Sequence, residues 1–169
     1  MANWIARLLR HRMFDEDDVA KVLPPAALAR VEARVKASEA RHGGEIRVYV
    51  EAGLPWSYLR RGATPRERAI ALFGKLGVWD TEGNNGVLIY LLLAEHAIEI
   101  VADRGLSRHV DDAAWVAIAD TMRDHFRRGD FAAGLERAVD AVDTLLVHHF
   151  PRVPGDADRN ELPDAPLLG

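Results

Sequence analysis

The amino-acid sequence predicts an α/β fold: a three-layer αβα sandwich whose mixed central sheet contains an antiparallel hairpin. One observation behind this prediction is residues 86–93, an unbroken apolar run of the length of one strand, which is typical of a strand covered by helices on both faces. The other is the order of helix, strand, helix, hairpin, helix and helix along the chain, which favours one layered sheet.

Four segments precede the apolar run. Residues 25–42 have apolar side chains at three- and four-residue spacing after two prolines, which predicts an amphipathic helix. Residues 45–51 alternate apolar and polar side chains and predict a strand. Residues 53–62 show no sustained periodicity, so we interpret them as a loop. Residues 65–76 predict a second helix, because a Thr-Pro-Arg-Glu capping box opens it.

The apolar run begins a predicted β-hairpin, and two helices follow it. A short turn at residues 94–96 leads to a returning strand at residues 97–102, and so short a connection favours antiparallel pairing. Residues 112–127 and 131–149 then have apolar side chains at helical spacing, with cationic side chains near the helix ends.

Length and composition fit one domain. The chain has 169 residues, of which 49% are apolar and 28% are charged, and these values are typical of a single globular domain. We place that domain at residues 15–151. It follows a basic amphipathic N-terminal segment at residues 1–14 and precedes a polar, proline-rich C-terminal tail at residues 152–169.

The composition also argues against several kinds of function. A formal net charge of -4 argues against a protein that coats nucleic acid phosphates, so we expect no nucleic-acid partner. The absence of cysteine excludes disulfides, thiolate catalysis and cysteine-ligated metals. The histidines form no H-E-x-x-H zinc motif, and Ser57 and Ser107 lack the G-x-S-x-G turn of a serine nucleophile.

The sequence contains no recognisable membrane span or signal peptide. Its longest apolar run is much shorter than the roughly 20 residues that cross a bilayer. The N-terminus lacks the uninterrupted apolar region of a signal peptide. We therefore expect a cytoplasmic protein that can also lie peripherally at a membrane.

The N-terminal segment is the first candidate for partner binding. Its apolar side chains recur at helical spacing with arginines between them: Trp4, Ile5, Leu8 and Leu9. The stripe is only about two turns long, which favours packing on the domain. The alternative is docking on a membrane protein or on an anionic membrane surface. Trp56 and Tyr58, beside Arg60 and Arg61, are a second candidate partner surface.

An acidic loop immediately before the apolar run is the first part of a candidate functional site. It contains four oxygen-bearing side chains: Asp80, Glu82, Asn84 and Asn85. Carboxylate and amide oxygens are ligands that calcium and magnesium prefer. The spacing resembles the first half of an EF-hand, but Asn85 stands where that loop needs glycine and Leu91 where it needs glutamate. Aspartate and asparagine are also ordinary turn formers, which is the alternative interpretation.

A second acidic loop follows the returning strand. In an antiparallel hairpin the start of one strand and the end of the next lie side by side, so we expect Asp103 to approach Asp80 or Asn84. The sequence therefore predicts a calcium or magnesium site whose candidate ligands are Asp80, Glu82, Asn84, Asn85 and Asp103.

The same region resembles a known family. The stretch FGKLGVWDTEGNNGVLIYLLLAEHAIEIVADRG, with Trp115, a Gly-Asp-Phe turn at residues 129–131 and His149-Phe150-Pro151 downstream, is similar to the TPM domain family. Within that family, the closer resemblance is to small soluble bacterial members. It covers roughly residues 14–151.

The resemblance implies an αβα sandwich that binds a divalent cation at the edge of the sheet where the two acidic loops lie. Asp80, Asn84 and Asn85 match the acidic-loop motif of the family, and Asp103 matches its second loop. For the plant thylakoid-lumen member, the resemblance implies acid phosphatase activity linked to photosystem repair. Many relatives carry a signal peptide and a C-terminal membrane anchor, neither of which we find in this sequence.

Two functional hypotheses follow. We favour a cation-binding accessory module for membrane-associated proteins, because the sequence supplies metal ligands without a complete catalytic set. The alternative is a metal-dependent, acid phosphatase-like phosphohydrolase. In that case Asp80 and Asp103 hold the metal, and Arg104 stabilises the charge that develops during phosphoryl transfer.

Overall fold

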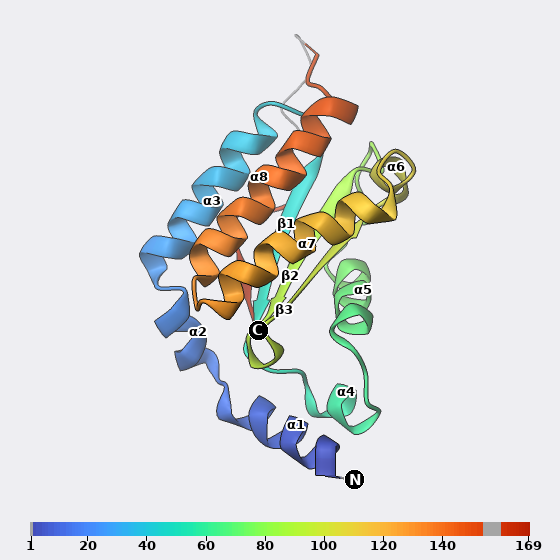
Figure 1. Ribbon diagram of the computed structural model, residues 1–169. Coiled ribbons are helices and arrows are strands. Elements are labelled where there is room, and N and C mark those ends of the chain that lie inside the picture. The colour runs from blue at the N-terminus through green and yellow to red at the C-terminus, as the bar shows by residue number, and fades with distance from the viewer. Residues whose placement is uncertain (1, 154–159) are drawn as a thin grey trace.

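A mixed sheet lies at the centre of the protein (Figure 1). The computed structural model describes residues 2–153 and 160–169, and within them four strands lie in the order β3-β2-β1-β4. The strands are β1 Glu45–Glu51, β2 Gly86–Leu92, β3 Ala97–Ala102 and β4 Leu167–Leu168. β1 runs parallel to β2 and β4, whereas β2 and β3 form an antiparallel hairpin. The predicted mixed sheet with a hairpin is confirmed.

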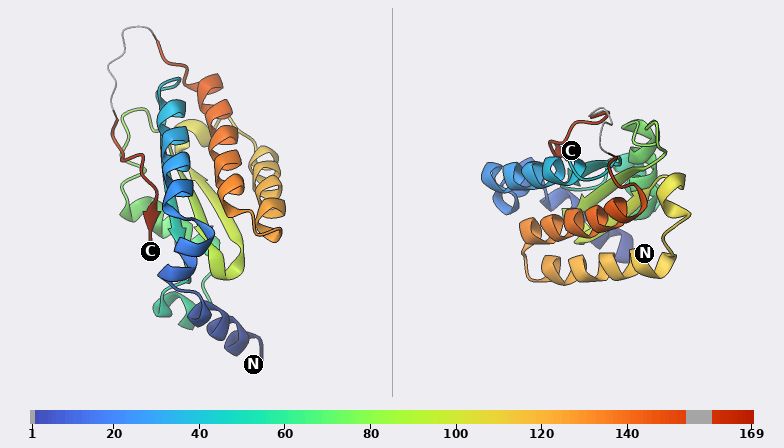
Figure 2. Two further views of the ribbon diagram at one scale, coloured as in Figure 1. Left: turned by 90° about the vertical axis from the view of Figure 1, so that its left-hand side faces the viewer. Right: turned by 90° about the horizontal axis from the view of Figure 1, so that it is seen from above.

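Helices cover both faces of this sheet. Those of the described residues are α1 Ala2–Met13, α2 Glu16–Val22, α3 Pro25–Glu39, α4 Trp56–Arg60, α5 Pro65–Lys75, α6 Arg104–Ser107, α7 Asp112–Arg127 and α8 Phe131–His149, and a 3-10 helix, η1, spans Leu93–Glu95. α3, α7 and α8 cover one face and α5 covers the other, which gives the predicted three layers (Figure 1 and Figure 2). None of these helices is both long and apolar enough to cross a membrane.

Strand β2 is buried on both faces, and this explains its unbroken apolar run. Alternate side chains enter two separate cores. The core under α3, α7 and α8 contains Val87, Ile89 and Leu91, whereas the core under α5 contains Leu88, Tyr90 and Leu92. All six side chains are fully buried, so a change at any of them removes core packing.

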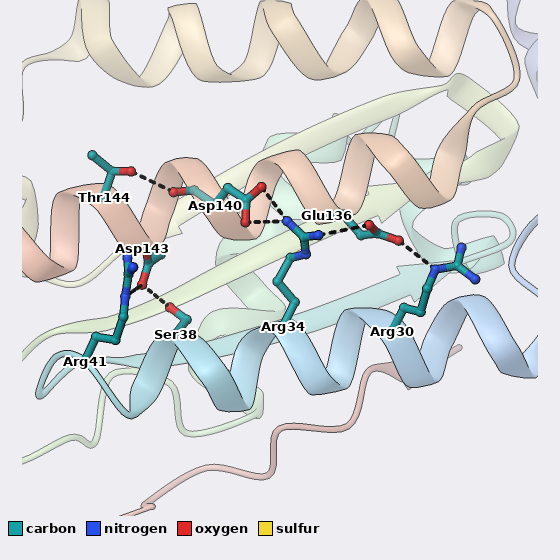
Figure 3. Close-up of polar contacts among 8 residues, drawn as sticks. All are labelled: Arg30, Arg34, Ser38, Arg41, Glu136, Asp140, Asp143 and Thr144. Atoms are coloured by element: carbon teal, nitrogen blue, oxygen red, sulfur yellow. Dashed lines mark hydrogen bonds and ion pairs between the residues drawn. The ribbon is translucent and has the colours of Figure 1, made fainter.

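A ladder of charged pairs joins α3, and Arg41 just beyond its end, to α8 (Figure 3). Its pairs are Arg30 with Glu136, Arg34 with Glu136 and Asp140, and Arg41 with Asp143. The residue numbers rise together on both helices, so the helices run in the same direction along this seam. The exposed pairs of this ladder contribute little to stability, whereas Asp143 is buried and its pair with Arg41 compensates a buried charge.

Two short helices depart from the sequence-based interpretation. Residues 53–62, interpreted as a loop, contain the five-residue helix α4, and none of its residues is buried. The seven-residue helix α2 was not predicted, although an Asp15–Asp18 capping box opens it. Both helices are too short to show the apolar periodicity on which a helix prediction depends.

The C-terminal tail extends the sheet. The Gly169 amide donates to the Val50 carbonyl at 2.9 Å, and the Ala52 amide donates to the Gly169 carbonyl at 3.1 Å. The buried guanidinium of Arg47 donates to the carbonyl oxygens of Pro163 and Ala165. The tail therefore covers the outer edge of β1. A two-residue strand has no alternation by which it could be predicted from sequence.

The predicted packing of the N-terminal apolar stripe on the domain is wrong. Helix α1 contacts the domain through polar groups: Arg7 Nε donates to Glu95 Oε1 at 2.7 Å, and His11 Nε2 lies 2.8 Å from the same oxygen. The Leu54 amide also donates to His11 Nδ1 at 3.0 Å. These polar contacts decide which side of α1 faces inward, and Trp4, Ile5 and Leu9 remain about half exposed.

Removing the buried Ile89 side chain should destabilise the domain far more than removing an exposed isoleucine. Ile89→Ala leaves a cavity between β2 and the α3 and α8 layer, so we expect a loss of about 2–5 kcal/mol in the free energy of unfolding. The matched control is Ile70→Ala on the exposed face of α5, which should change it by no more than about 0.5 kcal/mol. Chemical denaturation measures both variants, and equal losses would contradict the two-sided burial of β2.

Candidate functional site

The loop at residues 80–85 and the turn at residues 103–105 lie side by side, as the hairpin geometry predicts. We call them together the loop edge. They are joined directly, because the Gly105 amide donates to the Asn84 carbonyl at 2.8 Å. The loop edge thus lies where β2 begins and β3 ends.

Glycine at position 105 permits this close approach. A Cβ atom there would lie 2.3 Å from the Asn84 carbonyl oxygen and 2.9 Å from that of Gly83, and both are backbone atoms. Asn84 itself has a φ of 49°, in the left-handed region that asparagine tolerates better than most residues. The sequence pattern therefore specifies a tight backbone junction.

Asp103 is the buried carboxylate of the loop edge. Only 6% of the residue is exposed, and its amide donates to the Gly86 carbonyl at 2.9 Å. Its Oδ1 atom accepts from the Arg104 amide at 2.6 Å at the start of α6. Its Oδ2 atom is buried and has no hydrogen-bond partner among the described residues. One oxygen of this carboxylate is therefore hydrogen-bonded, and the other is buried without a hydrogen-bond partner among the described residues.

Asn85 offers a second unpaired oxygen. The residue is 4% exposed, and its Nδ2 atom donates to the Gly43 carbonyl at 2.8 Å. Because only the amide nitrogen can donate to a carbonyl, this bond fixes the orientation of the side chain. Its Oδ1 atom is then buried without a partner among the described residues. Asn85 directly precedes Gly86, whose carbonyl accepts a hydrogen bond from the Asp103 amide.

The other predicted ligands are arranged differently. Asp80, Glu82 and Asn84 are exposed, whereas Asn85 and Asp103 are buried. Within residues 2–153 and 160–169, no three His, Cys, Asp or Glu side chains converge in a way that could hold a metal ion. The five candidates therefore share one edge, but they do not form a closed cage of carboxylates.

A cavity of about 520 Å³ lies next to the loop edge, and sequence reasoning missed it. We call it the acidic pocket. Its charged lining residues are Lys36, Glu39, Glu45, Glu82, Arg152, Glu161 and Asp164. They come from α3, β1, the acidic loop, the segment after α8 and the C-terminal tail. No local motif contains them together, so only the folded chain reveals the pocket.

The tail closes one side of this pocket. Both carboxylate oxygens of Glu161 accept from the Glu82 amide at 3.2 Å, and the Leu162 amide donates to Glu45 Oε2 at 3.1 Å. Burial, with the charges of Glu45 and Asp164 nearby, raises the pKa of Glu39 to about 8, although a hydrogen bond from the Ile46 amide opposes the shift. Burial also raises the pKa of Glu45 to about 7.

Comparison with known families and structures agrees with this architecture. The family model described as "TPM domain" matches residues 17–145, which is most of the chain. The chain belongs to the TPM domain family. A comparison with curated proteins gave no match.

Two solved structures resemble this TPM domain over most of their length. The BA42 protein of the psychrophilic bacterium Bizionia argentinensis is 26% identical, with a TM-score of 0.74 over 87% of this chain and 95% of that one. The N-terminal domain of a P. gingivalis protein is 25% identical, with a TM-score of 0.63 over 79% of this chain and 84% of that one. The likeness supports the αβα fold.

A buried Ser-His-Asp cluster in this TPM domain lacks the geometry of a catalytic triad. Ser38 Oγ lies 2.8 Å from His42 Nε2 and donates to Asp143 Oδ1 at 2.9 Å; Figure 3 shows the second contact. His42 Nδ1 accepts from the Gly44 amide at 3.1 Å, so a neutral ring has its proton on Nε2. Burial lowers the pKa of His42 to about 4 and keeps it neutral. His42 therefore cannot take a proton from Ser38 through Nε2.

The buried titrating groups predict how stability varies with pH. The pKa of Glu39 is raised from 4.5 to about 8. Its contribution to the free energy of unfolding is therefore complete below pH 4.5 and is lost as the pH rises through 8. The pKa of His42 is lowered from 6.5 to about 4. Its contribution to the free energy of unfolding is therefore complete above pH 6.5 and is lost as the pH falls through 4. The gain from His42 and the losses from Glu39 and Glu45 oppose each other between pH 4.5 and 6.5, and above pH 6.5 the losses from Glu39 and Glu45 remain.

We therefore expect the free energy of unfolding to fall between about pH 6.5 and pH 8. Glu39→Gln keeps an oxygen for the Ile46 amide but does not titrate, so this variant should show a smaller fall over the same range. Denaturant melts at matched ionic strength measure both proteins. A wild-type curve that rises over this range, or a variant curve as steep as wild type, would contradict the prediction.

Proposed function

We propose that this TPM domain is a divalent-cation-binding accessory module for membrane-associated proteins, with calcium or magnesium bound at the loop edge. The main support is the Oδ2 atom of Asp103, which is buried and has no hydrogen-bond partner among the described residues. A buried polar atom without a partner is costly, and a buried charge is costlier still. A cation at this oxygen would remove that cost, so the residues fit the ion that the family implies.

The other oxygen donors of the loop edge have the right chemistry for a hard cation. Calcium and magnesium bind carboxylate, amide and backbone carbonyl oxygens, often together with water. Asn85 Oδ1 is an amide oxygen of this kind, and it too is buried without a partner among the described residues. Asp80 and Glu82 are exposed at the rim, where their carboxylates add negative charge. The set has no sulfur or imidazole donor, which favours calcium or magnesium over zinc.

The accessory role is supported by α1 at the other end of the hairpin. Its polar side holds it on the domain, so its apolar side chains are available to a partner. A partner at a membrane fits the combination of exposed apolar side chains and arginines. The proposed module would thus have a cation site at one end and a docking surface at the other.

A metal-dependent phosphohydrolase is the second candidate, and the acidic pocket is the observation that favours it. Burial raises the pKa of Glu39 to about 8, so its carboxyl group could act as a general acid near neutral pH. Lys36 and Arg152 line the same pocket and could face a phosphate group. However, carboxyl groups outnumber cationic groups in its lining, which favours cations over anionic esters. We therefore rank cation binding first.

Asp103→Asn should weaken cation binding without unfolding the domain. Asparagine is as good a helix N-cap as aspartate, so the hydrogen bond at the start of α6 can remain while the charge is lost. We expect the affinity for calcium or magnesium, measured by titration calorimetry, to fall at least about ten-fold. Asp124→Asn on the exposed side of α7 removes the same charge elsewhere and should leave the affinity unchanged. The cation site would be disproved by wild-type protein that binds neither ion.

Phosphate release separates the two candidate functions. If the accessory role is correct, the purified protein with magnesium, calcium or manganese should hydrolyse p-nitrophenyl phosphate no faster than its Asp103→Asn variant at acid or neutral pH. Hydrolysis that disappears in both Asp103→Asn and Glu39→Gln would instead establish the phosphohydrolase. Melting curves of both variants serve as the folding control.

A further inference from the structure

Helix α1 presents an apolar stripe to the outside of the molecule. Ile5, Leu9 and Met13 are 49%, 57% and 77% exposed. They follow one another at four-residue spacing, so they lie on one side of the helix. Arg7 and His11, which make the polar contacts with the domain, lie on the opposite side. The contacts that fix α1 on the domain thus turn its apolar side outward.

Arginines flank this stripe. Arg10 and Arg12 are exposed, and the sequence of α1 contains no acidic residue. Trp4 is 54% exposed near the N-terminal end of the helix. A short helix with an apolar side, flanking arginines and a tryptophan has the composition of an interfacial helix that lies in the plane of a membrane surface.

Helix α4 adds a second element of the same kind. It lies at the same end of the molecule as α1 in Figure 1 and Figure 2, and Arg7 Nη2 donates to the carbonyl of Ala63, just beyond α4, at 2.6 Å. Trp56 is exposed, as are Arg60 and Arg61, and the α4 sequence also contains no acidic residue. We call the exposed side chains of α1 and α4 the basic apolar end.

We propose that the basic apolar end docks on the surface of an anionic lipid bilayer, with α1 lying in the interface and arginines of both helices facing the phosphate headgroups. This inference rests on the docking part of the proposed function and names lipid as the partner. Tryptophans are enriched at the interface of a bilayer, where an amphipathic ring meets both phases. The attraction of arginine to anionic headgroups depends on charge and weakens with salt.

Charge also argues against a second copy of the chain as the occupant. A symmetric dimer through this end would bring the same surface of two molecules together. Each copy would contribute Arg10, Arg12, Arg60 and Arg61, and like charges across an interface repel. An anionic bilayer carries the complementary charge, so it suits this surface better.

Vesicle flotation tests the proposal with the full chain. We expect binding to phosphatidylcholine vesicles that contain about one third phosphatidylglycerol, and little binding to pure phosphatidylcholine. Leu9→Ser removes an apolar anchor, and we expect it to lower the partition coefficient at least about ten-fold. Arg10→Gln with Arg12→Gln should also lower it and reduce its salt dependence. Val116→Ser on α7 is the matched control, because Val116 is similarly exposed and lies away from α1 and α4.

The outcomes separate this inference from the cation site. Absence of binding to the anionic vesicles, equal binding to both vesicle types, or a Leu9→Ser variant that binds like wild type would each overturn the lipid proposal. Docking on a membrane protein alone would give no vesicle binding and would also overturn it. Calcium titration of the Leu9→Ser variant should match wild type, so loss of lipid binding and loss of cation binding are distinguishable. An unchanged melting temperature confirms that the variant is folded.

Discussion

The two-sided burial of β2 is the constraint on which the rest of the structure depends. Its side chains alternate between two cores, and a slip of one residue would move every one of them into the wrong core. The register of β2 therefore fixes its neighbours on both sides, parallel β1 and antiparallel β3. Since Val87 pairs with Ala102, the residues just beyond that pair must meet at the loop edge. Core packing alone thus brings Asp103 next to the backbone of the acidic loop.

This placement leaves two buried polar atoms of the loop edge without hydrogen bonds among the described residues. Asp103 and Asn85 each keep a buried oxygen without a partner among the described residues, although the side chains of Val87 to Leu92, directly after Asn85 and Gly86, are fully packed in the two cores. Local violations of good packing and pairing are concentrated at functional sites in natural proteins, where stability is exchanged for activity. Glycine at position 105, where no side chain fits, limits how far the loop could relax to satisfy these atoms itself. A buried water or a bound ligand, such as the proposed cation, would satisfy them.

The parts of the fold that depend on neighbouring residues were predictable from sequence, and those that depend on distant partners were not. The hairpin and the capping box at Thr64 are local, and both are present. The acidic pocket needs Glu39 and Glu161, which lie far apart in the chain and meet only through the tail. The orientation of α1 was equally inaccessible, because the helix has both an apolar and a polar side. The contact with Glu95, which is 84 residues away from His11, determines that the polar side of α1 faces the domain.

The two candidate sites lie at opposite ends of one hairpin, and this separation has a functional consequence. The loop edge adjoins the start of β2, whereas Glu95, which holds α1, follows its end. Seven residues of extended strand separate the two ends by roughly 23 Å. A cation at the loop edge is then too far away to bridge the protein to the anionic headgroups proposed to meet the basic apolar end. Its charge is also screened over such a distance at physiological salt. The proposed association with lipid should accordingly be independent of the cation.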